Sequence, residues 1–128
     1  MRGLGPWLLD ELLRRQLDVR VRVHRANILL PGGRPSDAWF INVWNASPRR
    51  SIGITHVWLE TNPQVHVTAR VPPARLEPDA QWETWVKAAD MPPGAGDVTR
   101  LARVKLTNGK VVHSGLRTDV PPAGLVPG

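Results

Sequence analysis

Cysteine and tyrosine are both missing from this 128-residue chain, and lysine and phenylalanine are scarce. Without cysteine the chain can form no disulfide and no thiolate metal site, and it has no cysteine nucleophile. No stretch approaches the roughly 20 consecutive apolar residues that a transmembrane helix needs. The length suits one domain that buries roughly two-thirds of its unfolded surface. We therefore expect a folded domain that needs no covalent cross-link and has no membrane span.

What the chain has in excess is arginine. The sequence holds 17 basic residues against 11 acidic ones, a formal net charge of +6, and all but three of the basic residues are arginine. Guanidinium groups suit bidentate contacts with carboxylates and phosphates. Residues 1–25 and 98–120 are net positive and residues 77–97 are net negative, so the charge is segmental and forms no basic tail. This balance is compatible with an anionic partner such as nucleic acid, and also with a simple compositional bias.

Residues 1–17 contain a predicted amphipathic docking helix. In the run PWLLDELLRRQL, Pro6 suits the first helical position, and the leucines fall on one stripe. The residues expected to bind are Trp7, Leu8, Leu9, Leu12 and Leu13. A helix of about three turns is not stable alone in water. The stripe must therefore cover the end of this domain's own core, or insert into a partner or a second copy.

The same segment does not read as a signal peptide. Acidic and arginine side chains interrupt the apolar stretch after a few residues, and no small-residue cleavage site follows. We therefore predict a cytoplasmic or virion location.

Residues 18–117 read as strands. Apolar and polar residues alternate with period two over most of this segment. The alternation predicts about seven strands at roughly ten-residue spacing, and no helix-period segment interrupts them. We expect a bulge or bend near residues 25–27, a strand over 64–71, and a change of phase between Ile54 and Val57. This pattern is typical of an antiparallel sandwich or small barrel, followed by a Pro/Gly-rich tail over residues 118–128.

The clearest single turn signal is Asn108-Gly109 between two apolar runs. Such a pair favours a two-residue type I′ turn, because both central residues then need positive φ. A two-residue loop would place Leu106 opposite Val111 and Val104 opposite His113.

Three stretches resemble parts of small immunoglobulin-like modules. FINVWNASPRR followed by SIGITHVWLE is similar to their second and third strands, RLEPDAQWETW to the corner before a late strand, and ARVKLTNGKVVHS to their closing hairpin. The likeness spans about residues 19–115 and is to bacterial and phage immunoglobulin-like, or fibronectin-like, domains. It implies an antiparallel immunoglobulin-like β-sandwich. The disulfide and tyrosine corner of antibody domains are absent from the sequence.

No residue pattern predicts a reaction centre. The histidines His24, His56, His66 and His113 lack metal-ligand spacing, although His56 and His66 would approach each other if their strands pair. Ser114 follows His113 directly, so the two side chains point to opposite faces of a strand and cannot form a nucleophile–base pair. We predict no enzyme activity, no cofactor and no metal.

The six tryptophans are the least ordinary feature. Trp39 and Trp44 have opposite parity in one predicted strand, and so do Trp82 and Trp85, so at least one of each pair should face outward. Exposed tryptophan beside arginine is typical of protein interfaces and of base-stacking surfaces. We predict a protein-binding or assembly module, such as an accessory subunit of a phage virion, with a second contact patch near Trp44, Arg49 and Arg50. The alternative is a basic nucleic-acid-binding protein.

Overall fold

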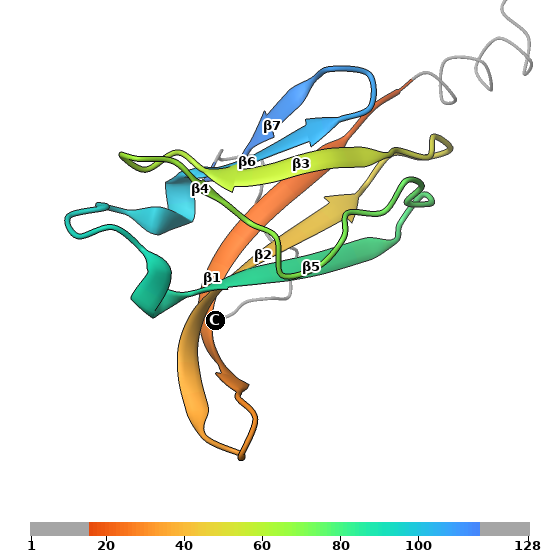
Figure 1. The fold of residues 1–128 in the computed structure, drawn as a ribbon. Coiled ribbons are helices and arrows are strands. Elements are labelled where there is room, and N and C mark those ends of the chain that lie inside the picture. Colours follow the sequence, from red (N-terminus) through yellow and green to blue (C-terminus); the bar gives the residue numbers. More distant parts are fainter. Residues whose placement is uncertain (1–15, 116–128) are drawn as a thin grey trace, which may run out of the picture.

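The computed structural model describes residues 16–115, which form two antiparallel β-sheets (Figure 1). One sheet has the order β1–β2–β5, made of β1 (Val19–Leu29), β2 (Pro35–Asn45) and β5 (Gln81–Lys87). The other has the order β4–β3–β6–β7, made of β3 (Ile54–Leu59), β4 (Val65–His66), β6 (Ala102–Leu106) and β7 (Val111–His113). Two short 3-10 turns, η1 (Ala88–Asp90) and η2 (Val98–Arg100), lie between β5 and β6.

The expectation of an all-β, antiparallel fold is confirmed for these residues. Residues 1–15 of the predicted docking helix and the predicted tail over 118–128 lie outside the described part. The three predicted segments, 1–17, 18–117 and 118–128, therefore stay predictions.

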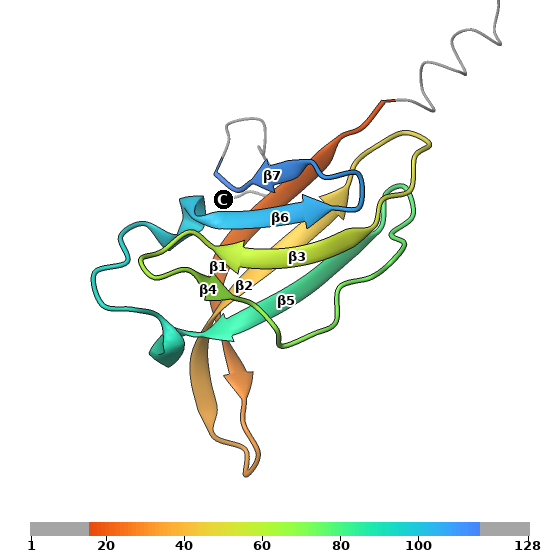
Figure 2. The ribbon, with the colours of Figure 1, turned by 45° about the horizontal axis from the view of Figure 1, so that its top comes forward.

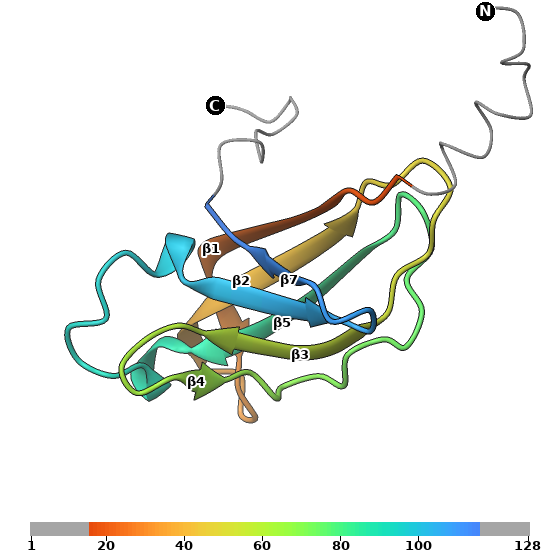
Figure 3. The ribbon, with the colours of Figure 1, turned by 90° about the horizontal axis from the view of Figure 1, so that it is seen from above.

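The two sheets lie as facing layers (Figure 3), and their apolar side chains form one core between them. The three-stranded sheet contributes Val21, Ile41 and Val43, each with no exposed surface. The four-stranded sheet contributes Leu59, Val104 and Leu106. Period-two alternation makes this possible, because every second side chain of each strand points inward. Full burial of one such aliphatic side chain stabilises the fold by roughly 1.5–3 kcal/mol.

The β1–β2 hairpin extends past the rest of its sheet (Figures 1 and 2). The two strands pair without a break from Val19 opposite Asn45 to Leu29 opposite Pro35, whereas β5 pairs with β2 only as far as Ala38. Of the two alternatives predicted near residues 25–27, a bulge or a bend, the unbroken pairing excludes the bulge. The apolar–polar alternation changes phase there because this part of the hairpin leaves the core, so burial no longer determines which side of the strand is apolar.

The change of phase along β3 has the opposite explanation, since it is a true β-bulge. Ile54 pairs with Leu106 and His56 pairs with Lys105, so the register shifts at Thr55. Thr55 and His56 are consecutive and both exposed. The extra residue lets Ile54 and Val57, which have opposite parity, both point into the core.

Two other expectations are corrected by the structure. The first is the strand predicted over 64–71, which is limited to Val65 and His66. After Val67, whose N–H still bonds to the Val57 carbonyl, the chain leaves the sheet to cross toward β5. Val71 is 88% exposed, so the alternation in this segment does not reflect a buried face.

The second is the hairpin between β6 and β7, which has a three-residue loop instead of a two-residue one. Lys105 lies opposite Val111 and Val104 opposite Val112, one residue away from the predicted register. Gly109 has φ 90°, and Asn108 is not among the residues with positive φ. The loop is therefore a type I turn closed by a left-handed glycine, which is the usual three-residue form.

The core face of β5 holds one polar atom with no partner among the described residues, the hydroxyl of Thr84. Its side chain is completely buried. Thr84→Val keeps the shape and removes the unsatisfied hydroxyl, so we expect the free energy of unfolding to rise by about 1 kcal/mol in a urea titration. Thr84→Ser is the matched control, because it keeps the hydroxyl, loses the methyl group and should be less stable than the parent. A Thr84→Val protein less stable than the parent would show that the hydroxyl does find a partner.

Candidate protein-binding face

The outward side of the three-stranded sheet carries a regular grid of large side chains. Alternate residues of each strand point away from the core, and the strand pairing aligns them in rows across the sheet. The rows are Arg20–Trp44–Gln81, Arg22–Asn42–Glu83 and His24–Phe40–Trp85. We call these nine residues the outer sheet face.

One row is a continuous band of rings across all three strands. The ring centroids of His24 and Phe40 lie 5.5 Å apart with nearly parallel planes, and those of Phe40 and Trp85 lie 5.9 Å apart at 40°. Phe40 and Trp85 are half-buried and His24 is exposed. Aromatic pairs at such separations gain about 0.5–1.5 kcal/mol beyond simple burial. The band is therefore an ordered apolar surface that is still partly open to solvent.

The next aromatic position on β2, Trp44, is held on two sides. The Arg20 guanidinium lies 5.3 Å from its ring centroid, and the indole Nε1 donates to Asp79 Oδ1 at 3.1 Å. Arg20 is itself fixed by Asp18, because its Nε and Nη2 donate to the two carboxylate oxygens at 3.2 and 3.0 Å. A contact surface whose side chains are already fixed loses less conformational freedom when it binds.

The loop that supplies Asp79 is itself strained. Asp79 has φ 68°, a left-handed conformation that favours glycine. The Ala80 N–H bonds to the Glu77 carbonyl, and Pro78 lies at the second position, so the turn is of type II. The only non-glycine residue with positive φ in the described part of the chain is thus the one that binds the Trp44 indole. Strained residues of this kind concentrate where a side chain must be positioned.

Charge is distributed unevenly over the outer sheet face. Arg20 and Arg22 lie on β1 at one edge, and Glu83 lies on β5 at the other. The Glu83 carboxylate is 38% exposed and lies 4.0 Å from His24 Nε2. Within the grid, two guanidinium groups therefore lie on β1 and one carboxylate on β5, with Lys87 one row further along β5 and the Arg70 Nη1 donating to the Glu83 carbonyl at 2.9 Å.

The residues singled out from the sequence fall in three places. Trp7 and the four leucines of the stripe lie outside the described residues. Trp44 and Trp85 lie on the outer sheet face, whereas Trp82 is buried and Trp39 packs against the core, so one member of each pair faces outward as predicted. Arg49 and Arg50 lie in the link between β2 and β3, and the cation over the Trp44 ring is Arg20.

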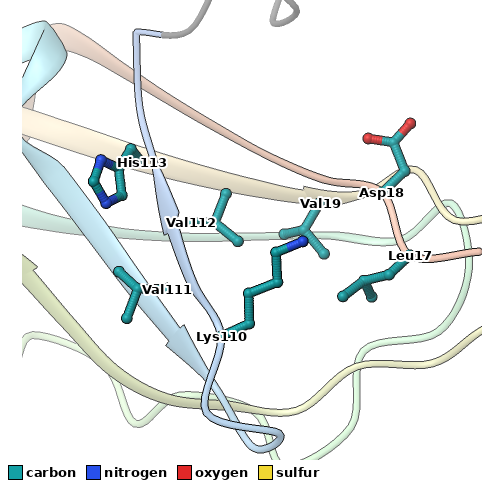
Figure 4. A pocket seen from close by; sticks show the side chains of 7 residues that line it. All are labelled: Leu17, Asp18, Val19, Lys110, Val111, Val112 and His113. Carbon is teal, nitrogen blue, oxygen red and sulfur yellow. The ribbon is translucent and has the colours of Figure 1, made fainter.

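A hollow of about 260 Å³ opens between the edges of the two sheets (Figure 4). Leu17 and Val19 line it from the start of β1, and Val111 and Val112 line it from β7. Lys110, Asp18 and His113 complete its wall. The hollow is mainly apolar, as is usual for a site that takes an apolar group.

The outward side of the four-stranded sheet is more basic. His66, Trp58, Arg103 and His113 form one row across its four strands. A carboxylate interrupts this row, because the Trp58 indole donates to Glu60 Oε1 at 2.8 Å. Hydrogen bonds from Gln64 and Trp58 lower the pKa of Glu60 from its ordinary value, so the carboxylate is charged beside the indole at neutral pH.

The histidines and Ser114, considered above as possible metal ligands or reactive groups, lie as follows. His56 and His66 lie on paired strands, but His66 is opposite Trp58 and not His56. Within residues 16–115 no three His, Asp or Glu side chains are grouped so that they could hold a metal ion. The Ser114 hydroxyl accepts from the Ala102 N–H at 3.0 Å and donates to the Thr99 carbonyl at 2.9 Å, so it joins β6 to η2. The described residues include no helix long and apolar enough to cross a membrane.

No protein-family model, curated protein or solved structure matches this chain. Its function is therefore inferred from its own residues.

The sequence contains part of the signal for the outer sheet face. Strand parity predicts one outward-facing tryptophan in each pair, but His24, Phe40 and Trp85 form a band only if β5 lies beside β2. These strands are far apart along the chain, and no local pattern specifies that pairing. The contact of Asp79 with Trp44 could not be predicted either, because an Asp after Pro predicts a turn but not a contact with an indole.

Proposed function

We propose that the protein is a non-catalytic protein-binding module with an immunoglobulin-like sandwich fold. The order of the strands supports the fold: β1 and β2 share one sheet, β3 and β4 the other, β5 returns to the first, and β6 and β7 close the second. This alternation between sheets is the arrangement expected of such sandwiches. Assembly into a larger complex such as a virion stays a prediction from the sequence.

The observation that carries the proposal is the composition of the outer sheet face. Trp44, Trp85 and Phe40 lie beside Arg20 and Arg22 on three adjacent strands. Tryptophan and arginine dominate the residues that contribute most to protein–protein binding, and aromatic residues and arginine are enriched at interfaces relative to other surfaces. The contacts of Arg20 and Asp79 with Trp44 hold its side chain in place before binding, and such preorganisation strengthens binding without adding contacts.

Site-specific photo-crosslinking tests the proposal on the full chain. A benzoylphenylalanine is introduced at Trp85 on the outer sheet face, and a matched control carries it at His56 on the other sheet. We expect one discrete protein adduct from position 85 in extracts of the cells that make this protein, because the partner covers that position, and none from position 56. Mass spectrometry then identifies the adduct, which is either a second copy or another protein.

A substitution at the same position measures how much the Trp85 side chain contributes to the binding affinity. Trp85→Ala should weaken binding to the cross-linked protein by about 2 kcal/mol, or roughly 30-fold, in a calorimetric titration. Lys105→Ala, on the other sheet, should leave the affinity unchanged. Equal, diffuse cross-linking from both positions would overturn the proposal.

Nucleic-acid binding is the second candidate, and one observation favours it. Trp58 and Arg103 lie side by side on the four-stranded sheet with Lys105 in the next row, and stacking beside cations suits single-stranded nucleic acid. The Glu60 carboxylate against the Trp58 indole opposes a phosphate backbone there, so we rank this candidate second. It predicts cross-links to RNA or DNA from position 56 and an affinity that falls by several decades between about 50 and 200 mM salt.

A further inference from the structure

We infer that the outer sheet face binds the same face of a second copy of this chain, across a two-fold axis that runs along β2. This inference rests on the proposed function and specifies its partner. It follows from the way in which charge and rings are arranged about the central strand.

The grid is complementary to itself under one rotation. A two-fold axis lying between two copies and parallel to β2 places β1 of each copy over β5 of the other and keeps every row in place. Arg22 then faces Glu83 of the second copy, and Glu83 faces Arg22 of the second copy, because both belong to the row centred on Asn42. Each opposite-charge contact therefore forms twice, as expected for an isologous interface.

The other two rows also match under this rotation. In the ring band, His24 faces Trp85 of the second copy, and Phe40 meets Phe40 on the axis. In the row of Arg20, Trp44 meets Trp44 on the axis and Arg20 faces Gln81 of the second copy. Every aromatic side chain of the face thus gains a ring as its new neighbour. Sheets that pack face to face lie about 10 Å apart, a gap that pairs of side chains of this length can fill from both sides.

The competing two-fold rotation is unfavourable. An axis perpendicular to the strands would bring Arg22 over Arg22 and Glu83 over Glu83 of the second copy. Like charges placed directly opposite each other are destabilising. The charge arrangement therefore selects the axis along β2.

The size of the face sets the expected strength. Nine residues a side, counted over the three rows, is well below the roughly 20–30 residues of a standard interface. We therefore expect a reversible dimer with a dissociation constant on the order of 10–100 µM. Sedimentation equilibrium or light scattering of the full chain between about 1 µM and 1 mM should show this concentration dependence.

Charge reversal followed by mixing tests the axis itself. Arg22→Glu places two acidic side chains opposite each other, and Glu83→Arg places two basic ones, so each variant alone should dimerise at least about tenfold more weakly. A 1:1 mixture of the two variants should recover the parental affinity. In the heterodimer both contacts again join unlike charges, because the new glutamate at position 22 of one copy meets the new arginine at position 83 of the other, and the unchanged Glu83 and Arg22 meet as before. The double variant R22E/E83R should recover the affinity as well.

Two controls separate this result from misfolding and from general charge effects. Lys105→Glu makes the same change of charge as Arg22→Glu on the other sheet and should alter the dissociation constant by less than about twofold. All variants should melt within a few degrees of the parent, since both sites are at the surface.

The outcomes distinguish this inference from the proposed function. Recovery on mixing supports the inference, whereas a dimer whose charge variants fail to recover on mixing overturns the axis. A chain that stays monomeric to about 1 mM while position 85 cross-links to a different protein overturns the inference and leaves the proposed function intact. A chain that neither dimerises nor gives a discrete protein adduct overturns both.

Discussion

Asn45→Ala should lower the free energy of unfolding by about 3–4 kcal/mol. The Asn45 side chain is fully buried at the end of β2. Its Nδ2 donates to the carbonyls of Arg50 and Leu76 at 2.7 and 3.0 Å, and its Oδ1 accepts from the Ser47 N–H at 3.1 Å. Truncation leaves three backbone groups without this partner, and each such loss costs roughly 1–3 kcal/mol where water cannot replace it. Chemical denaturation with urea measures the difference.

Asn42→Ala is the matched control, because Asn42 lies on the same strand but on the outer sheet face. It should change the free energy of unfolding by no more than about 0.5 kcal/mol. Asn45→Asp should destabilise at least as much as alanine at neutral pH, since a carboxylate oxygen would then face the two carbonyls. A loss below about 1 kcal/mol for Asn45→Ala would mean that water replaces the amide and that Asn45 does not hold these loops.

The position of Asn45 connects stability to the proposed site. Its backbone carbonyl accepts from the Asp79 N–H at 2.7 Å, and its N–H bonds to the Ala80 carbonyl at 3.0 Å. The turn that carries Asp79, whose carboxylate accepts from the Trp44 indole, is therefore fixed to the end of β2. A residue that stabilises the fold thus also orients an interface side chain, so variants at Asn45 should be judged by both stability and binding.

The alternation of residues predicted which side chains of a strand face outward better than it predicted which strands lie next to each other. Alternation predicted that one member of each tryptophan pair faces outward, and Trp44 and Trp85 do so while Trp82 is buried. The same rule failed over residues 64–71, where alternation exists without a sheet to impose it. Which strands lie side by side is a long-range choice made by the whole core, so the band from His24 to Trp85 could not be predicted.

The residues of the turn between β6 and β7 predicted that a hairpin forms there, but not its register. Asn108-Gly109 predicted a hairpin, and the hairpin forms. The residue preferences of a two-residue turn and of a three-residue turn with a terminal glycine overlap, however, so the register differed by one. The burial of Asn45 with three side-chain hydrogen bonds depends on chain segments that only the folded structure brings together.

Gly53→Ala should cost about 3 kcal/mol of unfolding free energy, for a steric reason. A Cβ at this position would lie 2.5 Å from the Ala74 carbonyl oxygen and 2.7 Å from Thr107 Cγ2. Neither neighbour can move away easily, because the Thr107 N–H bonds to the Gly53 carbonyl, and the Ile54 N–H bonds to the carbonyl of Pro73, next to Ala74. Inserting an atom into such a contact typically costs about 1–3 kcal/mol, and occasionally more. Urea denaturation of the variant and the parent measures the loss.

Two further variants identify the cause. Adding Thr107→Ser to Gly53→Ala removes the Cγ2 contact but leaves the backbone oxygen of Ala74, so only a minor part of the loss should return. Gly109→Ala is the contrasting case, because a Cβ there meets nothing within 4 Å while the φ of 90° disfavours alanine, and its cost should be about 1–2 kcal/mol. If Gly53→Ala costs no more than Gly109→Ala, the segment around Ala74 yields to the added atom. The approach of the Gly53 backbone to that segment would then be a loose contact.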